Sequence, residues 1–143
     1  MFAAVAAAIK ARMVAQWAST PYAATDVFWQ NEGNDVPDAA QFLFVDIVAD
    51  DQELAGIGGG PGGNLYRHKG TIDIQVLVPL NGGVDAGFVL ADAAAAIFRG
   101  QRFAGINVTV DCGTMPIQGG GAADNGRYFR VDAVGEFTAD FTG

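Results

Sequence analysis

The chain has 143 residues, of which 50% are hydrophobic and 17% charged, a composition that predicts one compact globular domain and excludes a disordered tail or a coiled coil. Sixteen acidic residues against eight basic ones give a formal net charge of -8, which argues against a conventional nucleic-acid binder, because such proteins bind phosphate through clustered Lys and Arg. The single cysteine, Cys112, and the single histidine, His68, exclude an intramolecular disulfide, a Cys-cluster zinc site and any paired-histidine site.

Residues 1–17 predict a helix with one buried face. Apolar side chains recur at spacings of three and four, at Phe2, Val5, Ile9, Met13 and Trp17, while Lys10 and Arg12 lie off this stripe. The two charges follow the apolar stretch, whereas in a signal peptide they would precede it, and the stretch is too short to cross a bilayer. We therefore expect a cytosolic, soluble product with no membrane segment.

The next part of the chain predicts strands and a long hairpin. Residues 27–29 predict a short strand, followed by a turn-rich stretch over 31–37. Residues 41–48 predict a strand with apolar side chains on both sides, so we expect both faces to contact protein. Residues 50–64 combine acids with many glycines, whose backbone entropy disfavours a strand interior, and predict a long mobile loop. Residues 66–79 alternate cleanly and predict a strand with one buried face, paired with the strand before the loop.

The second half predicts one more helix. Residues 84–99 place an inner stripe on Val84, Phe88, Ala91, Ala95 and Phe98. Arg99 and Gly100 are typical of a helix C-terminus, because a cation suits the end of the helix dipole and glycine readily adopts the left-handed conformation.

The last third predicts strands again. Residues 106–111 alternate, residues 119–125 form a glycine-rich loop, and residues 128–141 form one long strand bent at Gly135. The chain is therefore predicted to be an α+β protein, a single domain over residues 1–143. We expect an antiparallel or mixed β-sheet with two α-helices packed on one face and a long β-hairpin loop.

Motifs for catalysis or cofactor binding are weak. Residues 58–63 match the letters of the dinucleotide fingerprint G-x-G-x-x-G, but a strand follows them where the fingerprint requires a helix. His68 shares the parity of the apolar positions Ile72 and Ile74, which favours a structural or interface histidine over a general base. Cys112 follows Asp111, whose charge disfavours the thiolate.

The acidic residues do not form a recognisable site either. Those of residues 50–53 lack the alternating spacing of a calcium loop, so a solvated loop tip is expected. Asp132, Glu136 and Asp140 share a strand face without a partner that would separate their pKa values, as a glycosidase pair requires. The sequence therefore predicts no catalytic, cofactor-binding or metal site.

The composition of the surface leaves two states open, an oligomer and a monomer. The strand over 41–48 offers more apolar surface than two helices obviously cover, and the glycine-rich loops are of a kind that orders on contact. Both features favour assembly into an oligomer. A well-filled monomer with flexible loops explains the same features equally well.

The order of landmarks along the chain resembles the tail terminator proteins of long-tailed phages and of phage-derived gene transfer particles. The landmarks are an N-terminal helix, Val27-Phe28-Trp29-Gln30-Asn31 with Pro37 after it, a β-hairpin with a long tip, Gly70 opening a strand that ends at Pro79, Gly82-Gly83 before a helix with Leu90-Ala91-Asp92 and Phe98, then Phe103, Pro116-Ile117 and Gly126-Arg127-Tyr128-Phe129. They span nearly the whole chain.

The resemblance implies a structural virion protein that is not an enzyme and holds no cofactor. It implies a homo-oligomeric ring, a hexamer, stacked on the last ring of tail tube protein, where it stops polymerisation and offers a face to the head-completion or stopper protein. DNA would pass through the lumen without specific binding, which an acidic wall favours because it repels phosphate. Such a protein is made in the host cytoplasm and ends in the tail or neck of the particle.

On this reading the two loops, 50–64 and 119–125, are the expected contacts with partners. The interface candidates are Asp50, Asp51, Glu53, Gly58, Gly60, Arg67, Lys69, Gly120, Arg127 and Arg130. The cations among them are available to pair with acids of a neighbouring subunit. Two alternatives stay open: another neck or tail-completion protein of the same particle, and a small-ligand-binding or enzymatic α+β domain that uses the loop Gly58–Gly63.

Overall fold

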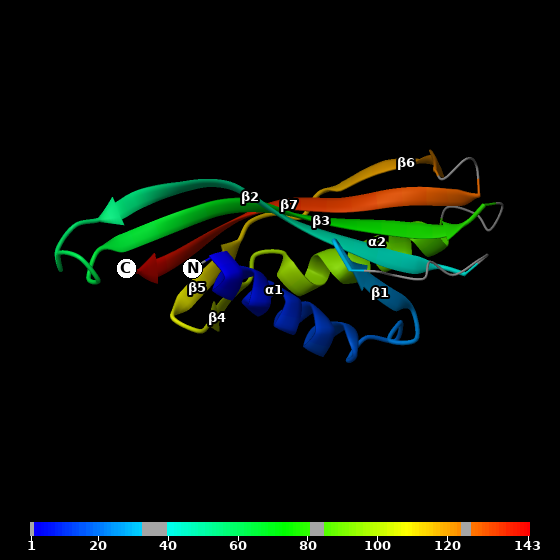
Figure 1. The fold of residues 1–143 in the computed structure, drawn as a ribbon. Helices are drawn as coiled ribbons and strands as arrows, with labels where there is room; N and C mark the ends of the chain where they lie inside the picture. Colours follow the sequence, from blue (N-terminus) through cyan, green and yellow to red (C-terminus); the bar gives the residue numbers. More distant parts are fainter. Residues whose placement is uncertain (1, 33–39, 81–84, 124–126) are drawn as a thin grey trace.

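The computed structural model describes residues 2–32, 40–80, 85–123 and 127–143. Within these residues the chain forms the helices α1 (Phe2–Trp17) and α2 (Asp85–Phe98) and the strands β1 (Asp26–Trp29), β2 (Phe42–Gly56), β3 (Leu65–Pro79), β4 (Arg102–Gly105), β5 (Val108–Cys112), β6 (Ile117–Ala123) and β7 (Tyr128–Thr142) (Figure 1). Most of the predicted turn over 31–37 lies outside the described residues. Neither described helix has the length and apolar character that crossing a membrane requires.

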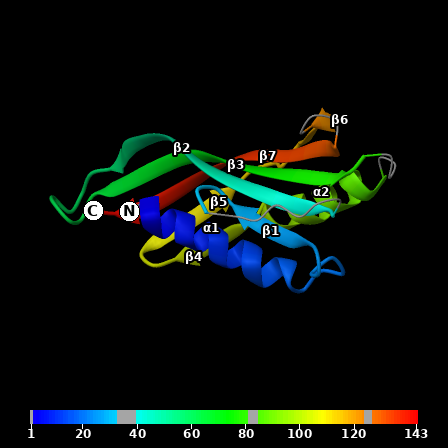
Figure 2. The ribbon, with the colours of Figure 1, turned by 45° about the vertical axis from the view of Figure 1, so that its right-hand side comes forward.

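The strands form one mixed sheet in the order β1-β2-β3-β7-β5-β4. β1 runs parallel to β2, while the other pairs are antiparallel. One edge of β7 pairs with β3 along its whole length, and the other edge is shared between β6, near the start of β7, and β5, near its end. Both helices lie on the same side of this sheet (Figures 1 and 2), so the predicted α+β fold is confirmed.

The core lies between the sheet and the helices. α1 buries Val5, Ile9, Met13 and Trp17, as its spacing predicts, and β3 buries Ile72, Ile74, Val76 and Val78. On β2, Leu43 and Val45 belong to the same core. Phe42 is buried on the opposite side of β2, where its ring contacts those of Phe28 and Tyr128, whereas Val48 is exposed. Protein therefore contacts both faces of β2 only near its start.

Helix α2 is confirmed, but the prediction of its inner face is wrong at Phe88. This side chain is 37% exposed and meets the ring of Phe129 edge-on, while the core side of the helix consists of Leu90, Ala91, Ala94, Ala95, Ile97 and Phe98. Small alanines let the helix lie close to the sheet, so a face built on them displaces the larger ring to the margin. Val84 lies outside the described residues. Gly100, two residues after the end of the helix, has a φ of 63°, which confirms the predicted glycine stop.

The prediction of a long loop over 50–64 is wrong, because β2 continues to Gly56 and the hairpin loop is confined to residues 57–64. Acids on this part of β2 lie opposite cations on β3: Asp51 pairs with Lys69, and Glu53 with Arg67. This cross-strand pairing supports a strand that composition alone disfavours.

The predicted glycine loop over 119–125 is also wrong over its described part. β6 pairs with β7 there, with a shift of register between Gly119 and Gly121. Gly119 and Gly120 have φ values of 84° and 115°, so these glycines allow a bulge within a strand. Residues 124 and 125 lie outside the described residues.

The strand predicted over 106–111 starts two residues later than expected. Ile106 is 80% exposed and, with Asn107 at a φ of 59°, forms the tight turn between β4 and β5. Asparagine tolerates this left-handed conformation, so the turn needs no glycine. β4 itself was not predicted.

Candidate functional site

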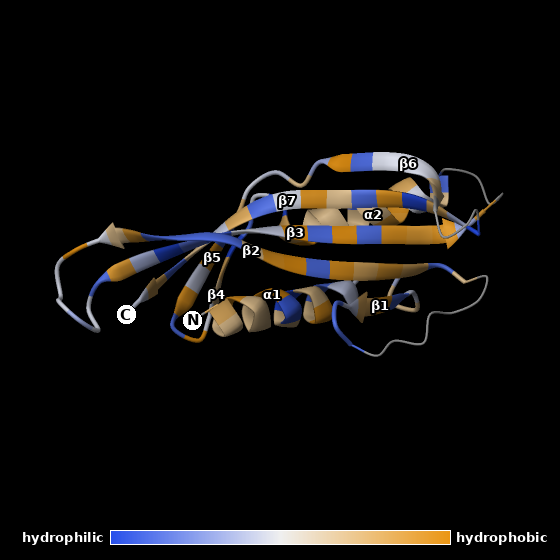
Figure 3. Cartoon of the chain, turned by 45° about the horizontal axis from the view of Figure 1, so that its top comes forward, coloured by the Kyte–Doolittle hydropathy of each residue, from blue (hydrophilic) through white to orange (hydrophobic). Residues whose placement is uncertain are grey.

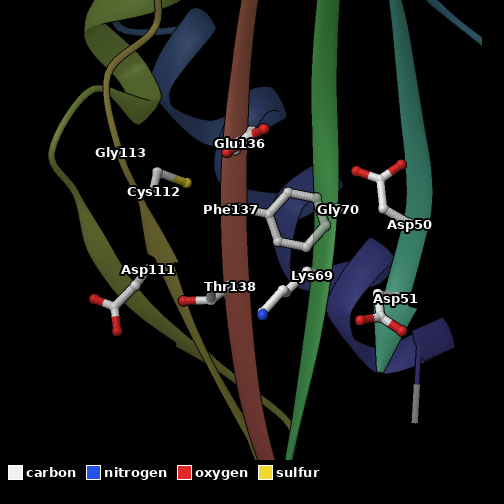
Figure 4. Close-up of a pocket in the computed structure, with 10 residues that line it drawn as sticks. All are labelled: Asp50, Asp51, Lys69, Gly70, Asp111, Cys112, Gly113, Glu136, Phe137 and Thr138. Atoms are coloured by element: carbon white, nitrogen blue, oxygen red, sulfur yellow. The ribbon is translucent and has the colours of Figure 1, made fainter. Parts of the chain in front are cut away.

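The sheet face opposite the helices carries most of the charge around the hairpin. Hydrophilic and hydrophobic positions alternate along β2, β3 and β7, as expected for strands with one buried face (Figure 3). Asp111, Thr138, Lys69 and Asp51 form a row across β5, β7, β3 and β2, because each is the Cα partner of the next (Figure 4). The sequence-predicted candidates Asp51 and Lys69 are thus brought together, with Asp51 on a strand where a loop was predicted and Lys69 on its predicted strand.

Ion pairs hold the neighbouring row of side chains. The guanidinium of Arg67 donates from Nε and Nη2 to the two carboxylate oxygens of Asp140, at 2.8 and 3.0 Å, and these bonds raise the pKa of Arg67. Lys69 Nζ lies 3.4 Å from Glu53 Oε1. Asp50 accepts a hydrogen bond of 2.8 Å from the hydroxyl of Thr71. Arg67, Lys69, Glu53 and Asp50 are therefore already engaged within the chain.

A shallow groove of about 650 Å³ runs over this face. Its polar lining comes from Asp50, Asp51, Lys69, Asp111, Glu136 and Thr138 (Figure 4). No group of three His, Cys, Asp or Glu side chains in the described part of the chain is arranged to hold a metal ion. What the groove offers is a mixed but mainly acidic surface that suits ion pairing with another molecule.

A second acidic group lies on the same face, nearer the other end of the sheet. Asp46 and Asp73 are cross-strand partners, and Asp132 is bound by Arg130 through two hydrogen bonds of 2.8 Å. Burial, followed by repulsion from Asp132, raises the pKa of Asp73 from 3.8 to about 6. Arg130, one of the predicted cations, thus neutralises an acid of its own chain.

We expect Asp73→Asn to raise the thermal midpoint by a few degrees at pH 8 and to change nothing below about pH 4. Between pH 4 and 6 the unfolded chain ionises this carboxyl while the folded chain keeps it protonated, so the cost to folding grows over that interval and is complete above about pH 6. Thermal unfolding of both proteins from pH 4 to 8 measures the difference. Asp92→Asn, on the exposed side of α2, is the control, and equal midpoints for Asp73→Asn and wild type at pH 8 would contradict the expected cost.

His68 and Cys112, the residue types most often used in catalysis, lie inside the fold. The His68 ring stacks on Phe141, with centroids 4.9 Å apart, and meets Phe2 edge-on at 5.3 Å. Burial lowers the pKa of His68 and raises that of Cys112 to about 11. The predicted parity of His68 is confirmed, because His68 belongs to the buried side of β3 with Ile72 and Ile74.

The end of the hairpin combines glycines with exposed apolar side chains. Gly58 and Gly60 lie in the loop, where Gly60 has a φ of 64°, and the strand β3 follows, so the dinucleotide fingerprint lacks its helix. Ile57 is 84% exposed, and Leu54 and Leu65 are exposed on the two strands that flank it. We call Leu54, Ile57 and Leu65 the apolar tip. The sequence does indicate the apolar tip, because apolar residues stand among the glycines and acids of this stretch. The prediction considered only the glycines and acids.

The remaining candidates lie away from the hairpin. Gly120 is at the bulge of β6, beside the rings of Phe88 and Phe129, and the exposed Arg127 comes directly before β7. β6 and the hairpin loop are at opposite ends of the molecule (Figure 1). The ten predicted residues therefore divide between two separate surfaces.

A groove of about 490 Å³ between α1 and β4 was missed by the sequence analysis, because β4 was not predicted. Its walls are alanines of the helix and residues of β4 and the following turn: Ala4, Ala7, Ala8, Ala11, Phe103, Ala104, Gly105 and Ile106. Arg12 lies at its margin, where the guanidinium is 5.1 Å from the centre of the Phe103 ring and Nε donates to the carbonyl of Ile97 at 2.8 Å. This groove is apolar with a basic rim, the reverse of the charged sheet face.

Comparisons with known proteins give one family and one fold. A family model described as phage tail terminator protein matches residues 4–132. Twelve solved chains match the structure, and one of them has a TM-score of 0.73 at 18% sequence identity, covering 100% of this chain and 98% of its own length. That likeness concerns the fold alone. A search of curated proteins found no match.

Proposed function

Because this chain belongs to the phage tail terminator protein family, whose members are structural components of the virion tail, we propose that it closes into a hexameric ring that ends the tail tube and joins the tail to the head. The observation that carries the proposal is the match of the family model over residues 4–132, nearly the whole chain. The ring is made in the host cytoplasm and acts in the tail or neck of a phage or gene transfer particle.

The unlike edges of the sheet support a ring. β1 covers β2 only as far as Val45, and among the described residues no strand pairs with the outer edge of β2 beyond it. β4 lies at the opposite edge of the sheet. Two different surfaces on one subunit form a heterologous interface, and such interfaces close into rings when the rotation between subunits allows it.

The charge distribution supports a lumen through which DNA passes. The acids of the sheet face exceed its cations, and several cations are already paired with acids of their own chain. A wall of this kind repels phosphate, so that DNA slides past without being held. We therefore propose that the sheet face opposite the helices lines the lumen.

The two separate groups of candidate residues fit two different neighbours. One group lies at the hairpin and the other at the β6 end, where Gly120, Arg127 and Arg130 are found. A terminator ring needs one face for the tail tube protein and another for the head-completion or stopper protein. We propose that the β6 end supplies one of these faces and that the strands of the hairpin behind its loop supply the other.

The ring is tested on the purified chain, alone and mixed with purified tail tube protein. Native mass spectrometry and negative-stain microscopy are expected to reveal a six-subunit ring in at least the mixture. A chain that remains at its monomer mass of 14.8 kDa in both samples would overturn the proposal.

A further inference from the structure

We propose that subunits join by insertion of the apolar tip of one copy into the groove between α1 and β4 of the next. The inference rests on the proposed ring and names the surfaces that close it. The groove is occupied by the tip of a second copy of this chain. Within one subunit the apolar tip stays exposed and the groove stays unfilled.

The apolar tip has the composition of an interface anchor. Ile57 is 84% exposed and directly follows β2, which pairs with β3 as far as Gly56 with two shifts of register, while β3 pairs with β7 along its whole length. Asn64 and Gly143 exchange backbone hydrogen bonds of 3.2 and 2.9 Å, which tie the base of the loop to the C-terminus. A rigid support of this kind lowers the entropy that is lost when Ile57 becomes buried in a partner.

The groove matches this tip in polarity. Four alanines keep the helix surface low, and Phe103 and the exposed Ile106 supply apolar walls on the β4 side. Burial of a branched aliphatic side chain there would remove its apolar surface from water, which stabilises the contact. One subunit therefore has an unfilled apolar groove and, elsewhere, an exposed apolar projection.

The charges around the two surfaces have opposite signs. Behind the tip, the acids Asp50, Asp51 and Glu53 of β2 outnumber the cations Arg67 and Lys69 of β3. Arg12 lies on the margin of the groove, and Arg102, 3.8 Å from Asp111, begins the adjacent strand β4 with 71% of its side chain exposed. Opposite charges at the rim would guide the tip to the groove and oppose tip-to-tip and groove-to-groove pairing.

Disulfide trapping tests the contact directly. We expect the double variant Ile57→Cys with Ala11→Cys to give, after mild oxidation of the assembled protein, a ladder of covalent oligomers that ends at the closed ring. A symmetric contact would stop the ladder at the dimer. Cys112 is buried and contributes no background in the folded protein. Ile57→Cys with Val14→Cys is the matched control, because Val14 is 58% exposed on the same helix but outside the groove, and it should give no ladder.

Blocking variants provide a second readout. Ile57→Asp and Ala11→Trp are expected to abolish the ring and return the mass to 14.8 kDa, while Val14→Trp assembles as the wild type does. All of these positions are exposed, so circular dichroism should show a folded chain in each case. Rings that form in every variant, without a disulfide ladder, would overturn this contact but leave the proposed ring intact. A wild-type chain that never assembles would overturn both.

Discussion

Gly135→Ala is expected to lower the free energy of unfolding by about 3 kcal/mol, at the upper end of the usual cost of overpacking. The segment between β5 and β6 crosses β7 at this residue: Gly113 donates to the carbonyl of Glu136, and Val134 donates to that of Pro116. A Cβ at position 135 would overlap the Met115 sulfur and come within 2.5 Å of the Thr114 carbonyl oxygen. Met115 is itself buried, so relief would require the backbone to move.

Urea denaturation measures this effect, with Gly113→Ala as the matched control. A Cβ at position 113 would have the carbonyl oxygen of Glu136 as its nearest neighbour, at an ordinary contact distance of 3.8 Å. The control should therefore unfold close to the wild-type midpoint. Equal midpoints for the two variants would show that the crossing does not require glycine at position 135.

Phe137→Ala is expected to lower the free energy of unfolding by about 3 to 5 kcal/mol, the range for removing a buried aromatic ring. The ring is almost fully buried at the centre of β7, where it packs over Gly70 on β3 and lies 6.3 Å from the ring of Phe2 on α1. The loss would leave a cavity where β3, β7 and the N-terminal helix meet.

The same urea titration tests this prediction, with Phe88→Ala as its control. The Phe88 ring is larger than any side chain on the core side of α2 except Phe98, yet it lies at the margin. Phe88→Ala should therefore lower the free energy of unfolding clearly less than Phe137→Ala does. A larger loss of unfolding free energy in Phe88→Ala than in Phe137→Ala would contradict this placement and would indicate that Phe88 belongs to the core side of α2, as the sequence predicted.

The periodicity of apolar residues correctly predicted the helices and strands that bury one side against the core. The stripe of α1 and the alternation of β3 and β7 were readable because each element buries one side, and the period then fixes the orientation. The extension of β2 to Gly56, the short β4 and the strand β6 were not readable, because acids and glycines in them hide the alternation typical of a strand. Each of these strands pairs with its neighbour in the chain, β2 with β3, β4 with β5 and β6 with β7.

The types of the candidate residues identified possible contacts, but they did not indicate on which elements these residues lie. Asp51 was expected on a loop and Lys69 on the strand after it, and the two instead face each other across two paired strands. The apolar groove could not be predicted, since its walls come from residues 4–11 and 103–106, which only the folded chain brings together. Ile106, predicted as part of a strand, is exposed at a turn beside it.

The most direct test of a terminator role is the length of the tails made by particles that lack this gene. Electron microscopy of such lysates should show tail tubes of variable and excessive length with no heads attached. Supplying the wild-type chain in trans should restore uniform tails joined to heads. Tails of normal length, attached to heads, in the absence of the protein would contradict the account.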